Sequence, residues 1–212
     1  MTPKTEAYYK KRGEQLVKNL RKRHFDACFC MDRSEALVQA LSLIPEGSSV
    51  GWGGTVSAQE LGLFEALRSG KYSLIDRDTC NTPEERNEVM KKCLLADVFI
   101  TGANAVSLEG ELVNIDGTGN RVAALSFGPE SVLVIVGMNK VMDTLDEAIT
   151  RARTVAAPMN QQRFLLNAPC SKTGSCADCI SDGCICNQIL ITRNCRPAGR
   201  IKVLVVGEDL GF

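Results

Sequence analysis

The segment SSVGWGGTVSAQELGLFEALRSGKYSLIDRDTCNTPEERNEVMKKCLLADVFITGANAVS (48–107) decides the fold, because short apolar runs alternate in it with charged stretches. The apolar runs are predicted strands, at 48–52 and 72–78 and, running into a loop, at 97–107. The stretches between them are predicted helices, at 56–70 and 82–96. Gly70 closes the first helix, and Thr82 with Pro83 begins the second. This alternation predicts an α/β domain with an open, largely parallel sheet.

The alternation continues on both sides of this segment. Upstream we expect helices at 5–23 and 34–44, the second capped by Ser34, and a strand at 25–31. Downstream we expect strands at 112–116, 122–128, 132–137, 189–193 and 201–208, and a helix at 144–164 that is interrupted near Pro158. Since no repeat or linker interrupts the pattern, we expect one α/β domain over 1–212 that contains a cysteine-rich segment at 170–195.

The charge balance argues against two classes of partner. Lys plus Arg and Asp plus Glu both number 25, so the basic excess that nucleic acids and membrane surfaces attract is absent. The basic stretch at 10–24 is read as a solvated helix face. The N-terminal residues lack the apolar core of a secretory signal, and the longest apolar run, SVLVIVG (131–137), is too short to span a bilayer. We therefore expect a cytoplasmic protein with no nucleic-acid partner and no membrane span.

Two glycine-bearing loops follow predicted strands, where α/β proteins bind ligands. The first, GWGGTVSAQE (51–60), offers Gly51, Gly53 and Gly54 before a helix, with hydroxyl groups on Thr55 and Ser57. Its backbone N–H groups could approach an anion, although a turn from strand to helix needs glycine in any case.

The second loop, TGANAVSLEGELVNIDGTGNRVA (101–123), is denser in polar residues than a plain connection needs. Asp116 is a candidate catalytic base, and Arg121 could clamp a carboxylate or phosphate. The alternative to a ligand-binding role for this loop is a hairpin turn at 116–120. Lys140 and Asn139 end the next strand and could reach the same pocket. The predicted ligand-binding set is Gly51, Gly53, Gly54, Thr55, Asn104, Asp116, Gly117, Gly119, Asn120, Arg121 and Lys140, and Asn114 stands in the same loop.

Six of the ten cysteines fall within 170–195, and the chain has one histidine, His24, so a metal site there would be rich in thiolates. Cys176 and Cys179 are spaced as a chelating pair. The predicted ligands are Cys170, Cys176, Cys179 and Cys186, with Cys184 and Cys195 as alternates. A 4Fe–4S cluster is the first interpretation and zinc the main alternative; disulfides and inert buried thiols stay open. The remaining four, Cys28, Cys30, Cys80 and Cys93, are read as packing residues.

Four long motifs resemble the LUD family of lactate-utilization proteins: GWGGTVSAQELGL, TGANAVSLEGELVNIDGTGNRVAALSFGP, VIVGMNKV and RIKVLVVGEDLGF. The resemblance runs from about residue 10 to the end of the chain. It implies a fold similar to the glucosamine-6-phosphate deaminase, ribose-5-phosphate isomerase and CoA-transferase group, with a pocket formed by the two loops. The second loop is also similar to the pocket loop of methylthioribose-1-phosphate isomerases. However, Asp116 takes a different place in that pattern and no catalytic cysteine–aspartate pair is visible, so isomerase activity does not carry over.

The resemblance also implies a role. Family members resemble one component of a multi-protein system that oxidises L-lactate to pyruvate, in which other components carry iron–sulfur clusters. We therefore expect a subunit or accessory of such a system, acting in electron transfer or assembly, with iron–sulfur proteins, a small anion and further copies of itself as partners. A sugar-phosphate or acyl-CoA-type isomerase or transferase is one alternative. A non-catalytic assembly subunit with structural zinc is the other, and whether the chain is an enzyme stays open.

Overall fold

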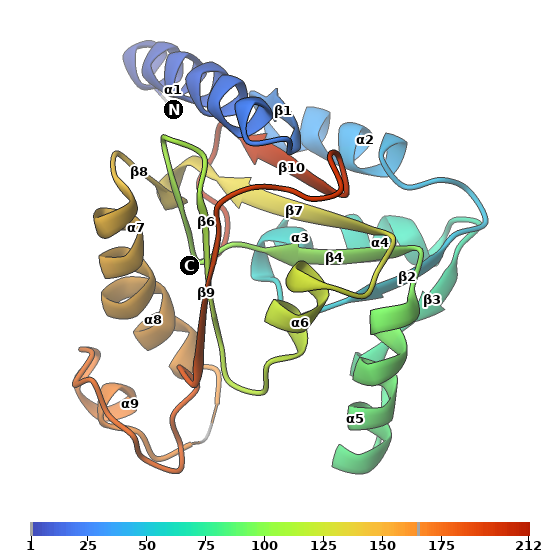
Figure 1. Ribbon diagram of the computed structural model, residues 1–212, viewed down its shortest axis with the longest axis vertical. Coiled ribbons are helices and arrows are strands. Elements are labelled where there is room, and N and C mark those ends of the chain that lie inside the picture. Colours follow the sequence, from blue (N-terminus) through green and yellow to red (C-terminus); the bar gives the residue numbers. More distant parts are fainter. Residues whose placement is uncertain (1, 165) are drawn as a thin grey trace.

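The computed structural model describes residues 2–164 and 166–212, and its framework is a fully parallel six-stranded sheet (Figure 1). In spatial order its strands are β1 (Asp26–Cys30), β10 (Ile201–Val206), β7 (Ser131–Gly137), β4 (Val98–Gly102), β2 (Ser49–Trp52) and β3 (Ser73–Ile75). A second, four-stranded sheet has the order β8 (Val141–Met142), β5 (Ala105–Ser107), β6 (Leu112–Asp116) and β9 (Gln188–Thr192). The predicted α/β class with a largely parallel sheet is confirmed.

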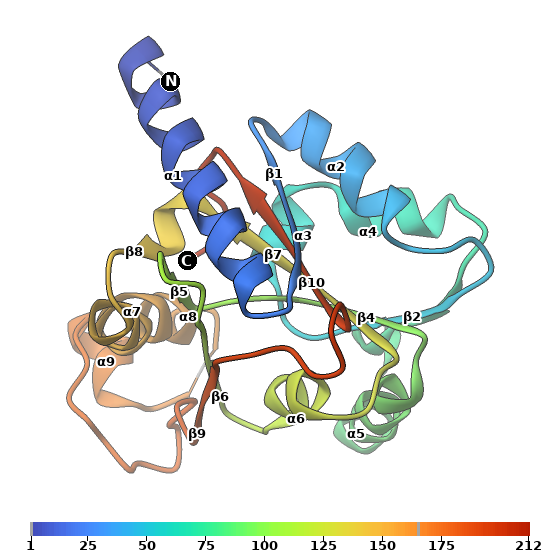
Figure 2. The ribbon, with the colours of Figure 1, turned by 45° about the horizontal axis from the view of Figure 1, so that its top comes forward.

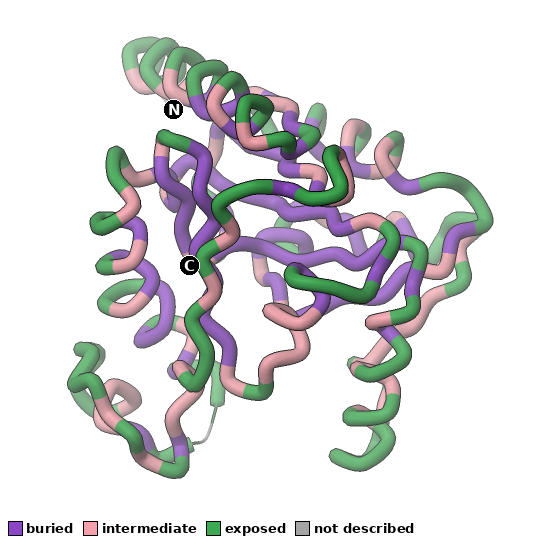
Figure 3. The backbone as a smooth tube through the Cα atoms, in the orientation of Figure 1, coloured by how far each residue is buried: buried purple, intermediate pink, exposed green. Residues whose placement is uncertain are grey.

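Helices cover both faces of the large sheet (Figures 1 and 2). One face packs against α1 (Pro3–Lys22), α6 (Asn120–Ser126) and the 3-10 turn η2 (Cys93–Leu95), which follows α5 (Pro83–Lys92). The other face packs against α2 (Arg33–Ser42), α3 (Val56–Glu60) and α4 (Leu63–Arg68). Because its central strands are buried on both sides, the sequence of β7 is an almost unbroken apolar run rather than an alternating one (Figure 3).

The second sheet carries a smaller core of its own. Ala105, Val113 and Ile115 pack against alanines of α7 (Leu145–Arg151) and of the π-helical turn η4 (Ala152–Ala156) that joins α7 to α8 (Ala157–Gln161). The predicted interruption near Pro158 is therefore confirmed as a π turn that ends just before this proline. The cysteine-rich segment follows, with α9 (Pro169–Thr173), and leads into the edge strand β9.

Several predicted elements are confirmed with small shifts of their ends, and others are wrong. Residues 122–128, predicted as a strand, belong mostly to helix α6, because the Asp116 carboxylate accepts the N–H groups of Arg121 and Val122 and so starts a helix. For the same reason the alternative of a hairpin at 116–120 is wrong. Residues 97–107, predicted as a strand running into a loop, contain two strands, β4 and β5, which lie in different sheets.

Two helix predictions are also corrected. The predicted helix 56–70 is split into α3 and α4 at Gly62, whose φ of 76° lies in the left-handed region. Helix α2 is capped by Asp32 rather than Ser34, since the Asp32 carboxylate accepts the N–H groups of Ser34 and Glu35. Two further 3-10 turns are η1 (Arg77–Thr79) and η3 (Met138–Lys140). Within the described residues, no helix is both long enough and apolar enough to cross a membrane.

Candidate functional site

The two glycine-bearing loops and the end of β7 meet at the carboxyl edge of the large sheet, as expected for an α/β protein. A small cavity of about 40 Å³ lies there, lined by residues that include Thr55, Ser57, Asn104, Arg121 and Lys140. A larger cleft of about 540 Å³ shares five lining residues with it: Gly54, Thr55, Arg121, Asn160 and Arg163. Because they share these residues, we call the two hollows together the cleft.

Glycine is required at the mouth of the cleft for close approach. A Cβ atom on Gly53 would lie 2.4 Å from Cγ of Arg121, so a side chain there would displace this arginine. A Cβ on Gly102 would lie 3.1 Å from the Thr55 hydroxyl. The Thr55 oxygen accepts the N–H of Ala58 at 3.3 Å and so caps α3. These contacts bring the arginine against the loop that follows β2.

Asp116 holds Arg121 in place. Its buried carboxylate accepts the N–H groups of Gly117 at 2.9 Å, Arg121 at 2.8 Å and Val122 at 3.3 Å. The Arg121 Nε lies 3.6 Å from the same carboxylate, and its guanidinium donates to the carbonyl oxygens of Gly54 and Ile115. The carboxylate is thus engaged by the start of α6 and by the arginine. These contacts make Asp116 a positioning residue for Arg121. A catalytic role for Asp116 stays a prediction.

Lys140 is a buried cation at the end of η3, with only 4% of its surface exposed. Its Nζ donates to the Ser57 hydroxyl at 2.8 Å, and that hydroxyl donates to the Leu210 carbonyl at 3.2 Å. Burial, with the nearby positive charge of Arg151, lowers the pKa of Lys140 to about 7. Among the described residues, no carboxylate forms an ion pair with Lys140. The cleft therefore contains an amine that is partly neutral at neutral pH.

The predicted ligand-binding residues divide into two groups. Nine of them line the cleft: Gly53, Gly54, Thr55, Asn104, Asp116, Gly117, Asn120, Arg121 and Lys140. Gly51 and Gly119 do not, because Gly51 packs against Cys93 and Gly119 lies beside Gln188. Asn114 is buried and donates to the Gly102 carbonyl, while Asn139 bonds to the backbone of Leu210 and Gly211.

Sequence reasoning missed cationic residues that line the cleft from other elements. Arg163 comes from the turn after α8, and Arg77 and Arg86 come from η1 and α5; the neutral Asn160, on α8, was missed as well. Arg86 donates to Asp78, whose carboxylate also accepts the Trp52 indole N–H at 3.1 Å. No local signal marks these arginines, because an arginine on or just after a helix is ordinarily solvated and only the tertiary fold brings it to the cleft.

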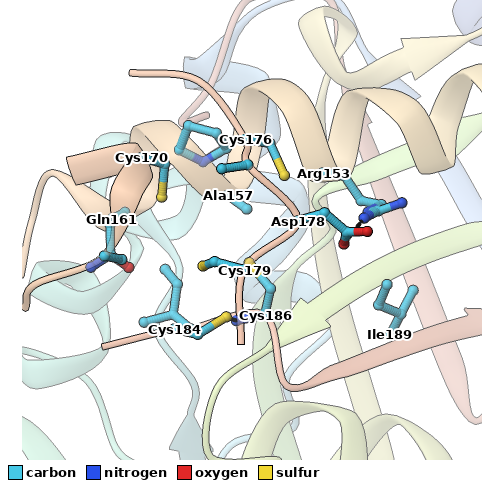
Figure 4. A pocket seen from close by; sticks show the side chains of 14 residues that line it. Arg153, Ala157, Gln161, Cys170, Cys176, Asp178, Cys179, Cys184, Cys186 and Ile189 are labelled. Carbon is cyan, nitrogen blue, oxygen red and sulfur yellow. Dashed lines mark hydrogen bonds and ion pairs between the residues drawn. The ribbon is translucent and has the colours of Figure 1, made fainter. Parts of the chain in front are cut away.

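Five of the six clustered cysteines gather around one cavity of about 80 Å³ (Figure 4): Cys170, Cys176, Cys179, Cys184 and Cys186. Cys195 is separate from them, since it is buried in the core of the large sheet, where its thiol lies 3.2 Å from the Pro197 carbonyl and accepts the Ile201 N–H. Cys28 and Cys30 pack together on one face of β1, and Cys93 is buried on the other side of the sheet, as expected of packing residues.

The five thiols differ in their surroundings. Burial raises the pKa of Cys186 to about 12. The pKa of Cys170 is also raised, mainly by burial and less by the charge of Cys179. The Ser181 hydroxyl, which donates to the Cys179 sulfur, lowers the pKa of Cys179. In the described residues, no three Cys, His, Asp or Glu side chains are arranged to hold a metal ion. As a donor set, five sulfurs around one space suit an iron–sulfur cluster or zinc.

The cysteine cavity and the cleft are neighbours. Ile185 lines both, and the backbone of Ile185 lies within 3.4 Å of where a Cβ on Gly117 would be. The Asn187 amide donates to the Gly117 carbonyl at 3.0 Å and to the Cys184 carbonyl at 3.4 Å. The cysteine segment is therefore tied to the loop that begins α6 and positions Arg121.

A family model described as LUD domain matches residues 13–206. The chain belongs to the LUD domain family. This family is associated with lactate utilization, so the expected family and its coarse role are confirmed. No curated protein matches the LUD chain.

Among solved structures, the LUD chain is similar to a DUF162 family protein from Deinococcus radiodurans, at 13% identity and a TM-score of 0.51 over 95% of this chain and 98% of that one. Ribose 5-phosphate isomerase A from Neisseria gonorrhoeae matches at 20% identity and a TM-score of 0.35 over 52% of each chain. The eIF2B delta subunit from Chaetomium thermophilum matches at 16% and 0.38, over 64% of this chain and 54% of that one. The first likeness shows a shared fold, and the two partial ones carry no functional conclusion.

Proposed function

We propose that this LUD protein is a subunit of an iron–sulfur-dependent system that oxidises L-lactate, in which its cysteine segment holds a 4Fe–4S cluster and its cleft takes a small carboxylate. The observation that carries the proposal is that five thiols surround one cavity, and that this cavity shares the wall residue Ile185 with a cationic cleft. A bound cluster would supply one-electron transfer. The family's association with lactate utilization supports the choice of substrate.

Four ligands suffice for a cluster, and five thiols are available. Cys170, Cys176, Cys179 and Cys186 are the proposed ligands, and Cys184 is the reserve. Asp178, which also lines the cysteine cavity, forms an ion pair with Arg153. The chain's own part in the chemistry is to gather these thiolates on a loop anchored between α8 and β9.

The charge of the cleft supports an anionic ligand. Arg121, Arg163 and Lys140 all line its inner end. Of the acids in the wall, Asp116 is engaged by the start of α6 and Asp78 by Trp52 and Arg86. The uncompensated charge is therefore positive, and guanidinium groups are well suited to carboxylates. Lactate and pyruvate carry one carboxylate each.

Anaerobic purification tests the cluster. We expect a brown protein with visible charge-transfer absorbance and about four iron and four sulfide per chain, the composition of a 4Fe–4S cluster. Serine variants of Cys170, Cys176, Cys179 and Cys186 should each lose most of the iron. Cys80→Ser is the matched control, since Cys80 lies outside the cysteine cavity. A colourless protein with one zinc per chain would contradict the proposal and favour a structural zinc.

Isothermal titration calorimetry tests the cleft. L-lactate or pyruvate should bind to the wild-type protein, and Arg121→Gln should weaken binding roughly tenfold or more, because a charge-assisted hydrogen bond contributes about 1.5–3 kcal/mol. Arg153→Gln is the control, since Arg153 is paired with Asp178 and lines the cysteine cavity instead. Equal loss in both variants, or no binding at all, would contradict the proposed cleft.

A further inference from the structure

Lys140 is unusual among the lysines of this chain because it is buried at the end of a cavity without a carboxylate partner in the described residues. An ammonium group in such a place is costly, so the amine is either neutral or paired with a ligand anion. Structural lysines are ordinarily solvated or paired with acids. The position of Lys140 therefore needs a chemical explanation.

The hydrogen bonds around Lys140 leave its nitrogen lone pair free. Ser57 Oγ lies 3.2 Å from the Leu210 carbonyl, which can only accept, so the serine hydrogen points there. The serine oxygen consequently accepts from Nζ, at 2.8 Å. This bond uses an N–H of the amine and not its lone pair. A neutral Lys140 thus presents an unoccupied nucleophilic nitrogen.

The cavity around the amine also provides for an acid group. Arg121 and Arg163 line the same small cavity as Lys140, which is continuous with the larger cleft. A Cβ on Gly211 would lie 3.2 Å from Nζ and 2.9 Å from Ser57 Oγ, so glycine there leaves space around the pair. A neutral amine beside guanidinium groups is the arrangement that recognises a carbonyl compound carrying a carboxylate.

We propose that Lys140 forms an imine with a 2-oxo acid, pyruvate being the simplest, bound in the cleft. The Nζ lone pair attacks the carbonyl carbon, a nitrogen-bound proton passes to the carbonyl oxygen, and loss of water leaves the C=N bond, with no change in oxidation state. Ser57 is the positioning residue that holds the amine. The inference rests on the anion cleft proposed above and is independent of the metal.

Burial and the charges that face Lys140 together favour its neutral form. Burial is the main cause, Arg151 from α7 and Arg121 from α6 add to it, and Glu60 from α3 opposes it. The Glu60 carboxylate is engaged by the Gly211 N–H at 2.7 Å. With a pKa of about 7 instead of the ordinary 10.5, about half of Lys140 is neutral at pH 7, against roughly one in 3,000 for an ordinary lysine.

Reductive trapping tests the imine. The full-length protein is incubated at pH 7 with pyruvate and sodium cyanoborohydride, and peptides are mapped by mass spectrometry. We expect one reduced pyruvyl group, located on Lys140 and at least tenfold more abundant there than on any other lysine. Lys140→Met should remove it. Lys202→Met should retain it, since Lys202 is a half-buried lysine on β10 whose Nζ donates to Leu43 O. L-lactate, which lacks the carbonyl, should give no adduct.

Calorimetry with pyruvate alone separates the two proposals. Pyruvate that binds without labelling Lys140, or that labels surface lysines equally, would overturn the imine and leave the cleft standing. Absence of binding would overturn both. Ser57→Ala provides a second readout: the adduct should form several-fold more slowly while the carboxylate still binds, and an unchanged rate would overturn the positioning role of Ser57.

Discussion

At the scale of single residues, burial sets the chemistry of Lys140 and predicts a pH-dependent stability. The pKa of Lys140 is about 7 in the folded chain and 10.5 by its ordinary value, so between these values the unfolded chain binds more protons and stability rises with pH. Below about pH 7, Lys140 is charged in both states and the folded chain bears the full cost of burying its ammonium group. Lys140→Met removes it and should stabilise the protein there, on the order of a few kcal/mol.

Urea unfolding of the wild type and Lys140→Met, at intervals from pH 6 to 10, measures this difference. The gap in unfolding free energy should be largest at pH 6 and should shrink steadily above pH 7. Lys202→Met controls for removing a lysine from the sheet, and its gap should not follow the same course. A gap for Lys140→Met that is constant with pH would show that the amine is charged in the fold.

Asp116 gives the second residue-scale prediction. Its carboxylate accepts three backbone N–H groups, whereas an asparagine amide has one acceptor oxygen and would turn its NH₂ group toward some of those donors. Asp116→Asn should lower the unfolding free energy by about 1–3 kcal/mol. Since Arg121 is positioned by the same carboxylate, pyruvate affinity should also fall.

Thermal unfolding and calorimetry check both effects of Asp116→Asn. Asp178→Asn is the matched control, because that carboxylate is 85% exposed and does not line the cleft. Unchanged stability combined with loss of a turnover measured in the wild type would instead favour Asp116 as a catalytic base.

At the scale of elements, the cysteine segment depends on tight backbone packing as well as on its thiols. A Cβ on Gly183 would lie 2.8 Å from the Asn167 carbonyl oxygen and 2.9 Å from its carbon and nitrogen, all backbone atoms that cannot simply rotate away. Gly183→Ala should therefore displace the loop that carries Cys179, Cys184 and Cys186 without removing a ligand, and metal content should fall by about half or more.

Metal analysis together with far-ultraviolet circular dichroism checks this prediction. Ser175→Ala is the control in the same loop, since Ser175 is exposed and its side chain forms no hydrogen bond within the described residues. Full metal content in Gly183→Ala would show that the loop conformation is unimportant for binding.

At the scale of the whole molecule, the two sheets differ in burial. Strand β4 and nearly all of β7 and β10 are buried, whereas β9 is an exposed edge strand that continues from the cysteine segment (Figure 3). Stability is expected to be uneven in the same way, with amide exchange slowest in the large sheet and fastest around β9. Because Asn187 and Ile185 tie the cysteine segment to Gly117, the loop that begins α6 should respond to the proposed metal.

Hydrogen exchange with and without metal tests this connection. Removing the metal anaerobically with a chelator should lower the melting temperature, since a ligand of the folded state is lost. Exchange should accelerate in 170–188 and 116–119 but not in β4, β7 or β10. In Asn187→Ala, removing the metal should accelerate exchange less at 116–119, while exchange in the cysteine segment still accelerates. A uniform change over the chain would contradict a local connection.

Sequence determined most of the framework, because periodicity and turn chemistry are local signals. The run SVLVIVG has the composition of a strand buried on both faces, and Thr82-Pro83 is a local signal for a helix start. The cysteine spacing and the family motifs are equally local. The error at 122–128 shows the limit: a short apolar run suits strand or helix, and packing of Ala124 and Leu125 together with capping by Asp116 decided for helix.

Tertiary structure alone decided which residues share the site. Lys140 meets a serine 83 positions earlier, Arg163 reaches the cleft because α8 folds back beside it, and Cys195 is drawn into the main core away from the other clustered thiols. The depressed pKa of Lys140 depends on burial, which is a property of packed surroundings and not of neighbours in the chain. Local sequence therefore specified the elements and the chemical groups, and non-local packing specified which groups meet and in which charge state.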